Sequence, residues 1–217
     1  LFTNTDPRLC ELSKSLAPAE PGHPFGFNRQ GCDIYSRVIY GARASVAVGV
    51  LTTLLVVVLG SLIGAVAGYF GGWIDSVLSR ITDIFFAIPL VLAAIVVMQM
   101  FKEHRTIITV VLVLGLFGWV SIARITRGAV VSIKNEEFVQ SARSIGASNW
   151  HILFSHILPN AAAPIISYAT VALGTYIVAE ATLSFLGIGL PPTFVSWGGD
   201  ISDAQASLRV APAVLFY

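Results

Sequence analysis

The strongest constraint on this chain is an uncharged stretch. Residues 44–74, between Arg43 and Asp75, contain no Asp, Glu, Lys or Arg. A helix needs about 20 apolar residues to cross a bilayer, so we expect a span at 44–70 followed by a glycine-rich exit. Of all residues, 55% are hydrophobic and 12% charged, and the mean hydropathy is +0.79. A single soluble core cannot bury so much apolar surface in a chain of this size, which argues against a soluble globular enzyme.

Three further stretches predict spans, at residues 84–101, 106–123 and 161–179. Pro89 lies near the start of the first of these, where it predicts a static kink or a gating hinge. Another apolar run begins at residue 208 and the given sequence stops within it, and there is no initiator Met. We therefore expect an all-α membrane protein, a polytopic helical bundle cut from a longer chain.

Residues 1–43 form a polar, proline-containing segment without the apolar core of a signal peptide. Cys10 and Cys32 lie in it. If the segment faces an oxidising compartment, these two residues form a disulfide; otherwise they are unrelated thiols. The formal net charge of +1 provides no basic stripe for nucleic acid.

Residues 135–160 read as two amphipathic helices joined by a turn. Phe138, Ala142 and Ile145 fall on one face of the first helix, and Trp150, Leu153, Phe154 and Ile157 fall on one face of the second. Gly146 separates the two patterns, Ser148 is placed to cap the second helix, and Pro159 is expected to end it. The alternative is a helix lying on the membrane surface, which Glu136 and Glu137 disfavour because they repel anionic lipid.

This loop resembles the cytoplasmic loop of permease subunits of binding-protein-dependent ABC importers. That motif has Glu-Ala-Ala, three residues, Gly, nine residues, Ile, one residue and Leu-Pro. Here Gln140, Ser141 and Ala142 stand at its start, Gly146 at the glycine, and Leu158-Pro159 at its end. The chain departs from the family pattern at Gln140, Ser141 and His156.

Three other blocks resemble the second permease subunit of the dipeptide, oligopeptide and nickel importers. They are HPFGFNRQGCDIYSRVIYGAR at 23–43, GYFGGWIDSVLSRITDIFFAIP at 68–89, and EATLSFLGIGLPPTFVSWG at 180–198. The family usually has Arg where Cys32 stands. The resemblance implies the type 1 ABC importer permease fold, with six spans in the full chain, about four complete here and part of a fifth. It makes 1–43 external and 44–217 the permease domain, with the cytoplasmic coupling loop at 124–160.

The resemblance also implies a function and partners. The chain is expected to be the channel subunit of an importer of dipeptides or oligopeptides in the cytoplasmic membrane, with a nickel importer as the alternative. Expected partners are a second homologous permease subunit, two cytoplasmic ATPase subunits, an external substrate-binding protein and lipid. No GxxxxGK[ST] motif occurs, so no cofactor is expected on this chain, and ATP and Mg are expected on the ATPases. The residues expected to contact an ATPase are Glu137, Phe138, Gln140, Ser141, Ala142, Gly146, Ala147, Trp150, Leu158 and Pro159.

Lys and Arg residues are slightly more numerous on the side that the resemblance makes external, so the charge bias by itself favours the opposite orientation. We keep the orientation that the resemblance implies. The sequence disfavours two other classes of membrane protein. An intramembrane enzyme needs a polar constellation within the spans, which the sequence lacks, and a receptor has no reason to carry the loop motif.

Two features of the spans are candidate sites. Small residues at every fourth position let helices approach closely; here the stripe is Gly60, Gly64, Gly68 and Gly72, which packs within the subunit or against the partner permease. Glu180 either lines the translocation pathway or ends a span at the interface. His151 and His156 are five residues apart, off one α-helical face, so we expect neither a metal site nor catalytic residues.

Overall fold

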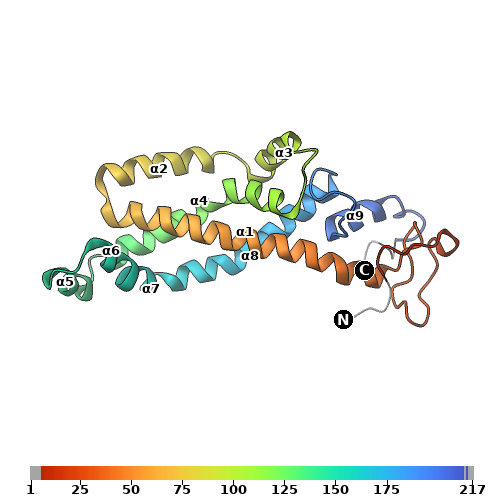
Figure 1. The fold of residues 1–217 in the computed structure, drawn as a ribbon, viewed down its shortest axis with the longest axis horizontal. Helices are drawn as coiled ribbons and strands as arrows, with labels where there is room; N and C mark the ends of the chain where they lie inside the picture. The colour runs from red at the N-terminus through yellow and green to blue at the C-terminus, as the bar shows by residue number, and fades with distance from the viewer. Residues whose placement is uncertain (1–5, 213, 215–217) are drawn as a thin grey trace. The chain divides into compact units, whose positions relative to one another are not determined.

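The computed structural model describes residues 6–212 and 214, and most of this range is helical (Figure 1). The elements are the 3₁₀-helix η1 (Leu12–Lys14), α1 (Ile34–Phe70), α2 (Gly72–Phe86), α3 (Leu90–Met100), α4 (Ile107–Ile133), α5 (Glu137–Ser144), α6 (Asn149–His151), the π-helix η2 (Ile152–Ile157), α7 (Leu158–Asn160), α8 (Ala162–Phe185) and α9 (Trp197–Gln205). β pairing within the described range is limited to isolated bridges. The all-α prediction is confirmed.

Three helices, α1, α4 and α8, are long and apolar enough to cross a membrane. Large apolar side chains such as Leu54, Leu112 and Val178 remain exposed on them, as on helices whose outer faces contact lipid. All three extend beyond the predicted spans. Helix α1 begins at Ile34 instead of residue 44, because Asp33 caps it: the Ser36 backbone N–H donates to Asp33 Oδ2 at 3.1 Å.

The predicted span at 84–101 is not one continuous helix, and the kink predicted at Pro89 is present. Helices α2 and α3 lie on either side of a break at residues 87–89 and are bent by 81° relative to one another. Proline has no N–H to donate and disfavours helical backbone at the residue before it, so Pro89 ends one helix and begins another. The two helices together pass as one broken span or a re-entrant loop.

The apolar run expected from residue 208 begins without a helix. Residues 208–210, at the start of the run expected from residue 208, form turns, and positions 213 and 215–217 of that run lie outside the described residues. Further back along the chain, residues 183–185 complete α8 and the residues that follow form turns.

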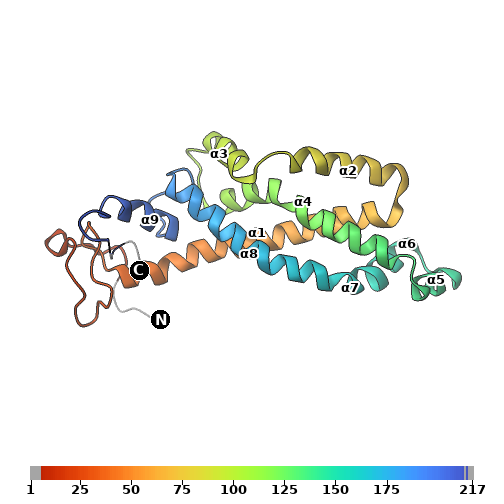
Figure 2. The same cartoon turned by 180° about the vertical axis from the view of Figure 1, so that it is seen from behind.

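The chain divides into two compact units. The first takes its described residues from Leu1–Val50, Ile95–Val111 and Tyr176–Tyr217, and it contains the N-terminal segment and α9. The second is formed by Leu51–Ala94 and Leu112–Thr175. In the second unit, α5, α6 and α7 lie together beside the end of α4 and the start of α8, as seen from both sides (Figures 1 and 2).

The glycine stripe explains how α1 packs in the second unit. A Cβ atom at Gly64 would lie 2.2 Å from the Ala123 carbonyl oxygen, and Cβ atoms at Gly60 and Gly68 would lie 2.6 Å and 2.9 Å from other carbonyl oxygens of α4. The stripe therefore packs within the subunit, which is one of the two alternatives that the sequence predicts. Gly72 is not part of it: it begins α2 with a φ of +55°, and a Cβ there would meet nothing within 4 Å.

Helix α2 packs against α4 through two ion pairs in the same unit. Arg127 Nη2 donates to Asp75 Oδ2 at 2.6 Å, and Arg124 Nη2 donates to Asp83 Oδ1 at 2.7 Å. Arg124 also lies over the ring of Phe86, 3.9 Å from its centroid. The sequence predicts only a glycine-rich exit at the start of this stretch, because charges separate the apolar residues of α2.

Candidate functional site

The first half of the 135–160 loop is α5, and a glycine turn ends it. Gly146 has a φ of +85°, the left-handed conformation that glycine adopts at helix ends. Its N–H donates to the Arg143 carbonyl at 3.0 Å, and the Ala147 N–H donates to the Ala142 carbonyl at 3.1 Å. These two bonds are those of a Schellman motif, so the turn predicted from Gly146 is present in the structure.

The second half of the loop begins with a cap. Ser148 Oγ accepts the backbone N–H of His151 at 3.3 Å, as predicted for a helix N-cap. The helical backbone continues through α6, the π-helix η2 and α7. The sequence predicts that Pro159 ends the second helix, but this residue lies inside α7. A proline ring clashes with the carbonyl four residues earlier in an α-helix. The wider π turns just before it allow helical backbone to pass through this residue.

The π-helix also corrects the prediction for the two histidines. The rings of His151 and His156 lie 5.5 Å apart between centroids, although residues five apart diverge on an α-helix. A π-helix closes its hydrogen bonds between residues i and i+5, which brings the two onto one face. No group of three or more potential metal ligands occurs within the described residues.

The loop has a buried apolar side within the second unit. Val139, Ile152, Leu153 and Ile157 are fully buried, and with Ala142 they belong to one cluster. The cluster also includes Ala65 and Tyr69 of α1, Val130 of α4, Ala161, and Ile165 of α8. The loop is therefore held against three long helices by apolar contacts.

The exposed side of the loop differs from the predicted faces. Phe138 is 42% exposed, Ile145 86% and Trp150 54%. The residues that the periodic patterns place on the same faces, Ala142, Leu153 and Ile157, are buried. Periodicity identifies residues that share a face, but the packed neighbours decide which face is covered. Trp150 stacks on Phe154, with 5.9 Å between ring centroids, and contacts Phe70 edge-to-face at 5.4 Å.

The remaining loop residues line the outside of α5 or flank the turns. A shallow open hollow on α5 is lined by Glu137, Gln140, Ser141, Ser144 and Ile145. Gln140 Nε2 donates to the Asn135 carbonyl at 3.0 Å. Ala147 and Leu158 are partly buried and pack against the apolar cluster.

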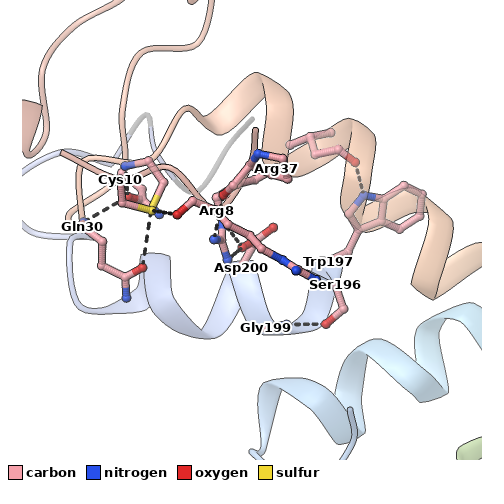
Figure 3. A network of polar contacts seen from close by, with 12 residues as sticks. Arg8, Cys10, Gln30, Arg37, Ser196, Trp197, Gly199 and Asp200 are labelled. Atoms are coloured by element: carbon pink, nitrogen blue, oxygen red, sulfur yellow. Dashed lines mark hydrogen bonds and ion pairs between the residues drawn. A yellow bond between two sulfur atoms is a disulfide. The ribbon is translucent and has the colours of Figure 1, made fainter. Parts of the chain in front are cut away.

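The N-terminal segment, in the first unit, is closed by covalent and polar bonds. The structure joins Cys10 and Cys32 in a disulfide (Figure 3). The buried Asn28 side chain accepts the backbone N–H groups of Gln30 at 3.0 Å and Cys32 at 2.9 Å. His23 Nδ1 lies 3.2 Å from Oδ1 of Asp33, the residue that caps α1.

An ion pair links α1 to α9 in this unit. Arg37 Nε donates to Asp200 Oδ1 at 2.6 Å, and Trp197 Nε1 donates to the Val38 carbonyl at 2.9 Å (Figure 3). A pocket of about 840 Å³ lies beside them, lined also by Leu12, Arg29 and other residues of the same unit. Burial raises the pKa of the Asp200 carboxyl and outweighs the opposing effect of Arg37. No local pattern predicts this pair, because its members are far apart along the chain.

Glu180 lies inside α8 and is fully buried, so it is not a solvated residue at the end of a span. Ser184 Oγ donates to Glu180 Oε1 at 2.7 Å and accepts the Leu190 N–H at 3.1 Å. The Oε2 atom is buried and has no hydrogen-bond partner among the described residues. In the single chain, Glu180 therefore helps to fix the turn after α8 and lines no open surface.

Comparisons with known proteins identify the family. Residues 60–217 match the family described as "Binding-protein-dependent transport system inner membrane component". The glutathione transport system permease protein GsiD of Pectobacterium atrosepticum is 36% identical over 90% of this chain and 64% of its own length. The oligopeptide permease OppC of Bacillus subtilis is 35% identical over the whole chain and 70% of its own length. The dipeptide permease DppC of Alkalihalophilus pseudofirmus is 39% identical over the whole chain and 71% of its own length.

A solved structure has the same fold. A chain of the MetNI methionine ABC transporter, in an inward-facing conformation, matches with a TM-score of 0.69 and 18% identity, over 83% of this chain and 87% of that one. The chain described here spans about two thirds of the length of its curated relatives. It belongs to the family of binding-protein-dependent transport system inner membrane components, the multi-pass permease subunits of ABC importers.

Proposed function

We propose that this chain is a channel subunit of an ATP-driven importer of short peptides. The observation that carries the substrate class is the agreement of three relatives, whose names specify glutathione, oligopeptide and dipeptide transport. Each of these substrates contains at least one peptide or amide linkage and is small enough to pass through a bundle of helices. Nickel transport, the alternative from sequence, is named by none of these three relatives.

The 135–160 loop is proposed to couple the channel to the ATPase subunits. Its two helices meet at a Schellman turn and are fixed by a buried cluster, so the element is rigid. Its outer side presents Phe138, Ile145 and Trp150, apolar side chains that a partner covers. An amphipathic helix with such anchors fits an apolar groove on another protein. In this proposal residues 1–43 are external and the loop is cytoplasmic.

The proposed complex contains two permease subunits, two ATPase subunits and an external binding protein. ATP and Mg bind the ATPases, and closure of the ATPases moves the loop. The loop connects α4 to α8 along the chain, so its movement displaces both of these spans. The external binding protein delivers peptide to the opposite face, where the N-terminal segment and α9 are proposed to lie.

Gly146→Asp tests the coupling proposal in the assembled, full-length transporter. We expect normal membrane insertion, together with loss of bound ATPase or of uptake, because a charged side chain then occupies the turn between the two helices. Gly187→Asp is the matched control: Gly187 has a φ of +71° and, like Gly146, nothing within 4 Å of a Cβ position. It therefore imposes a similar backbone strain outside the loop.

Three quantities are measured in one preparation: inserted subunit, bound ATPase, and uptake of labelled dipeptide, oligopeptide, glutathione and Ni²⁺. Full uptake in Gly146→Asp would refute coupling through this loop. Uptake of Ni²⁺ without peptide would refute the substrate class and leave the coupling result intact.

A further inference from the structure

The C-terminal end of α1 contacts the loop directly, although it is remote from the loop along the chain. Tyr69 Oη donates to Asn149 Oδ1 at 2.9 Å. Asn149 is the first residue of α6, immediately after the Ser148 cap. Tyr69 is 8% exposed, and its ring belongs to the apolar cluster beneath the loop. The hydrogen bond thus fixes the start of the second loop helix to α1.

A second hydrogen bond fixes α1 at the entrance to the loop. Lys134 follows α4 directly, and its Nζ donates to the Gly68 carbonyl at 2.7 Å. Carbonyl groups in the last turn of a helix lack intrahelical partners, and a lysine ammonium both binds them and complements the helix dipole. The last turn of α1 is therefore bound on both sides of α5, at Lys134 before it and at Asn149 after it.

Apolar contacts support the two hydrogen bonds. Ala65, one turn before Tyr69, is 1% exposed within the same cluster as Ile152 and Leu153. Beyond Tyr69, the ring of Phe70 contacts the ring of Trp150 edge-to-face. Residues 65–70 thus pack against the buried core of the loop and also contact its exposed aromatic side.

We propose that Tyr69 and Lys134 are positioning residues that make α1 a third span driven by the loop, in addition to α4 and α8. This inference rests on the proposed coupling function. Helices α4 and α8 follow the loop because they are its chain neighbours, whereas α1 follows it only through side-chain contacts. When an ATPase displaces α6, the Tyr69–Asn149 bond transmits that displacement to the end of α1.

Tyr69→Phe in the assembled transporter is the direct test, because it removes the hydroxyl and keeps the ring. A single hydrogen bond shifts a two-state equilibrium by about two- to tenfold. We therefore expect the ATP hydrolysed per substrate imported to rise by about two- to tenfold, with unchanged ATPase binding. Tyr168→Phe, the same chemical change on α8, should leave this ratio unchanged.

The partner residues give an independent pair of variants. Asn149→Ala removes the acceptor and should raise the ratio as Tyr69→Phe does, whereas Asn149→Asp keeps an acceptor oxygen and should preserve it. Lys134→Met should also raise the ratio. A purely structural role for these residues would lower thermal stability in all the variants and leave ATP hydrolysed per substrate unchanged.

The outcomes separate this inference from the proposed function. If Gly146→Asp uncouples the transporter while Tyr69→Phe, Asn149→Ala and Lys134→Met all keep the wild-type ratio, the inference is overturned and the coupling role of the loop stands. If Gly146→Asp keeps full uptake, the proposed function fails first. A raised ratio in Asn149→Asp equal to that in Asn149→Ala would also overturn the role of the hydrogen bond.

Discussion

The N-terminal segment and the 135–160 loop are held together by different forces. The segment is closed by the Cys10–Cys32 disulfide and by buried polar side chains such as Asn28 and Asp33. The loop has no cysteine and is held by a cluster of buried aliphatic side chains around Leu153. Both regions consist of short secondary-structure elements and turns. The disulfide and buried polar side chains make the segment rigid, whereas packed aliphatic side chains make the loop rigid.

This difference indicates what each region can do alone. The segment is cross-linked by its disulfide and by the two backbone N–H groups that the Asn28 side chain accepts, so its shape depends little on a partner. The loop buries one side and leaves Phe138, Trp150 and Phe154 exposed on the other. Exposed aromatic side chains in a rigid frame are typical of the central residues of protein interfaces. The segment therefore needs no partner to hold its shape, whereas the loop presents an aromatic surface suited to a protein interface.

The largest expected effect on stability comes from disrupting the packing of α1 on α4, next to the loop. Gly64→Leu forces a side chain toward the Ala123 carbonyl, which a Cβ already approaches to 2.2 Å. We expect a loss of about 3 kcal/mol or more of stability, because overpacked helices must separate. Gly128→Leu is the control, since a Cβ there meets nothing within 4 Å. Equal thermal stability and yield for both variants in detergent would show that α1 does not pack on α4 at Gly64.

The next largest effect on stability is expected from removing the disulfide of the N-terminal segment. The double variant Cys10→Ser/Cys32→Ser should lose about 3 kcal/mol, the chain-entropy value for a loop of this length. A reductant should lower the melting temperature of the wild type and leave that of the double variant unchanged. Mass spectrometry that finds both wild-type thiols free would contradict the disulfide.

A smaller effect tests the polar bonding of the first unit. Arg37→Met leaves the Asp200 carboxyl without its cation and should cost about 2 kcal/mol at neutral pH, below the value for a fully buried pair because both side chains keep some exposure. Arg37→Met/Asp200→Leu removes both charges and should recover most of this loss. A double variant no more stable than the single one would contradict the account.

The same pair makes a prediction for pH dependence. Burial raises the folded-state pKa of Asp200 above its unfolded value, so protonation stabilises the folded state. This contribution is present below the unfolded pKa and is lost as pH rises through the folded pKa. The stability deficit of Arg37→Met should therefore shrink as the pH is lowered through that pKa, as measured by thermal unfolding at a series of pH values.

The smallest expected effect on stability tests whether the exposed aromatic side of the loop is a protein interface. Trp150→Ala should cost less than about 1 kcal/mol of stability, because the side chain is 54% exposed. It should nevertheless weaken ATPase binding strongly. Leu153→Ala, which truncates a fully buried side chain, should instead cost about 2–5 kcal/mol. If Trp150→Ala lowered stability as much as Leu153→Ala does, Trp150 would be a core residue and not an interface residue.

The sequence by itself determined the features that depend on neighbouring residues. The uncharged stretch from residue 44 predicted a membrane helix, because the bilayer excludes charge over a fixed length. Gly146 and Ser148 predicted the turn and the cap of the loop, because left-handed backbone and side-chain capping are properties of single residues. The spacing of the glycines at 60, 64 and 68 predicted close helix packing, and left its partner open.

Tertiary structure alone decided the features that depend on residues far apart. Phe138 and Val139 are adjacent, yet only Val139 is buried, because it belongs to the apolar cluster that includes Leu153 and Phe138 does not. The Tyr69–Asn149 and Arg37–Asp200 contacts join residues 80 and 163 positions apart in the sequence, and no periodicity encodes such pairs. Glu180 is buried within α8, which continues past the predicted end of its span. A sequence pattern specifies which residues share a face, and packing determines what that face meets.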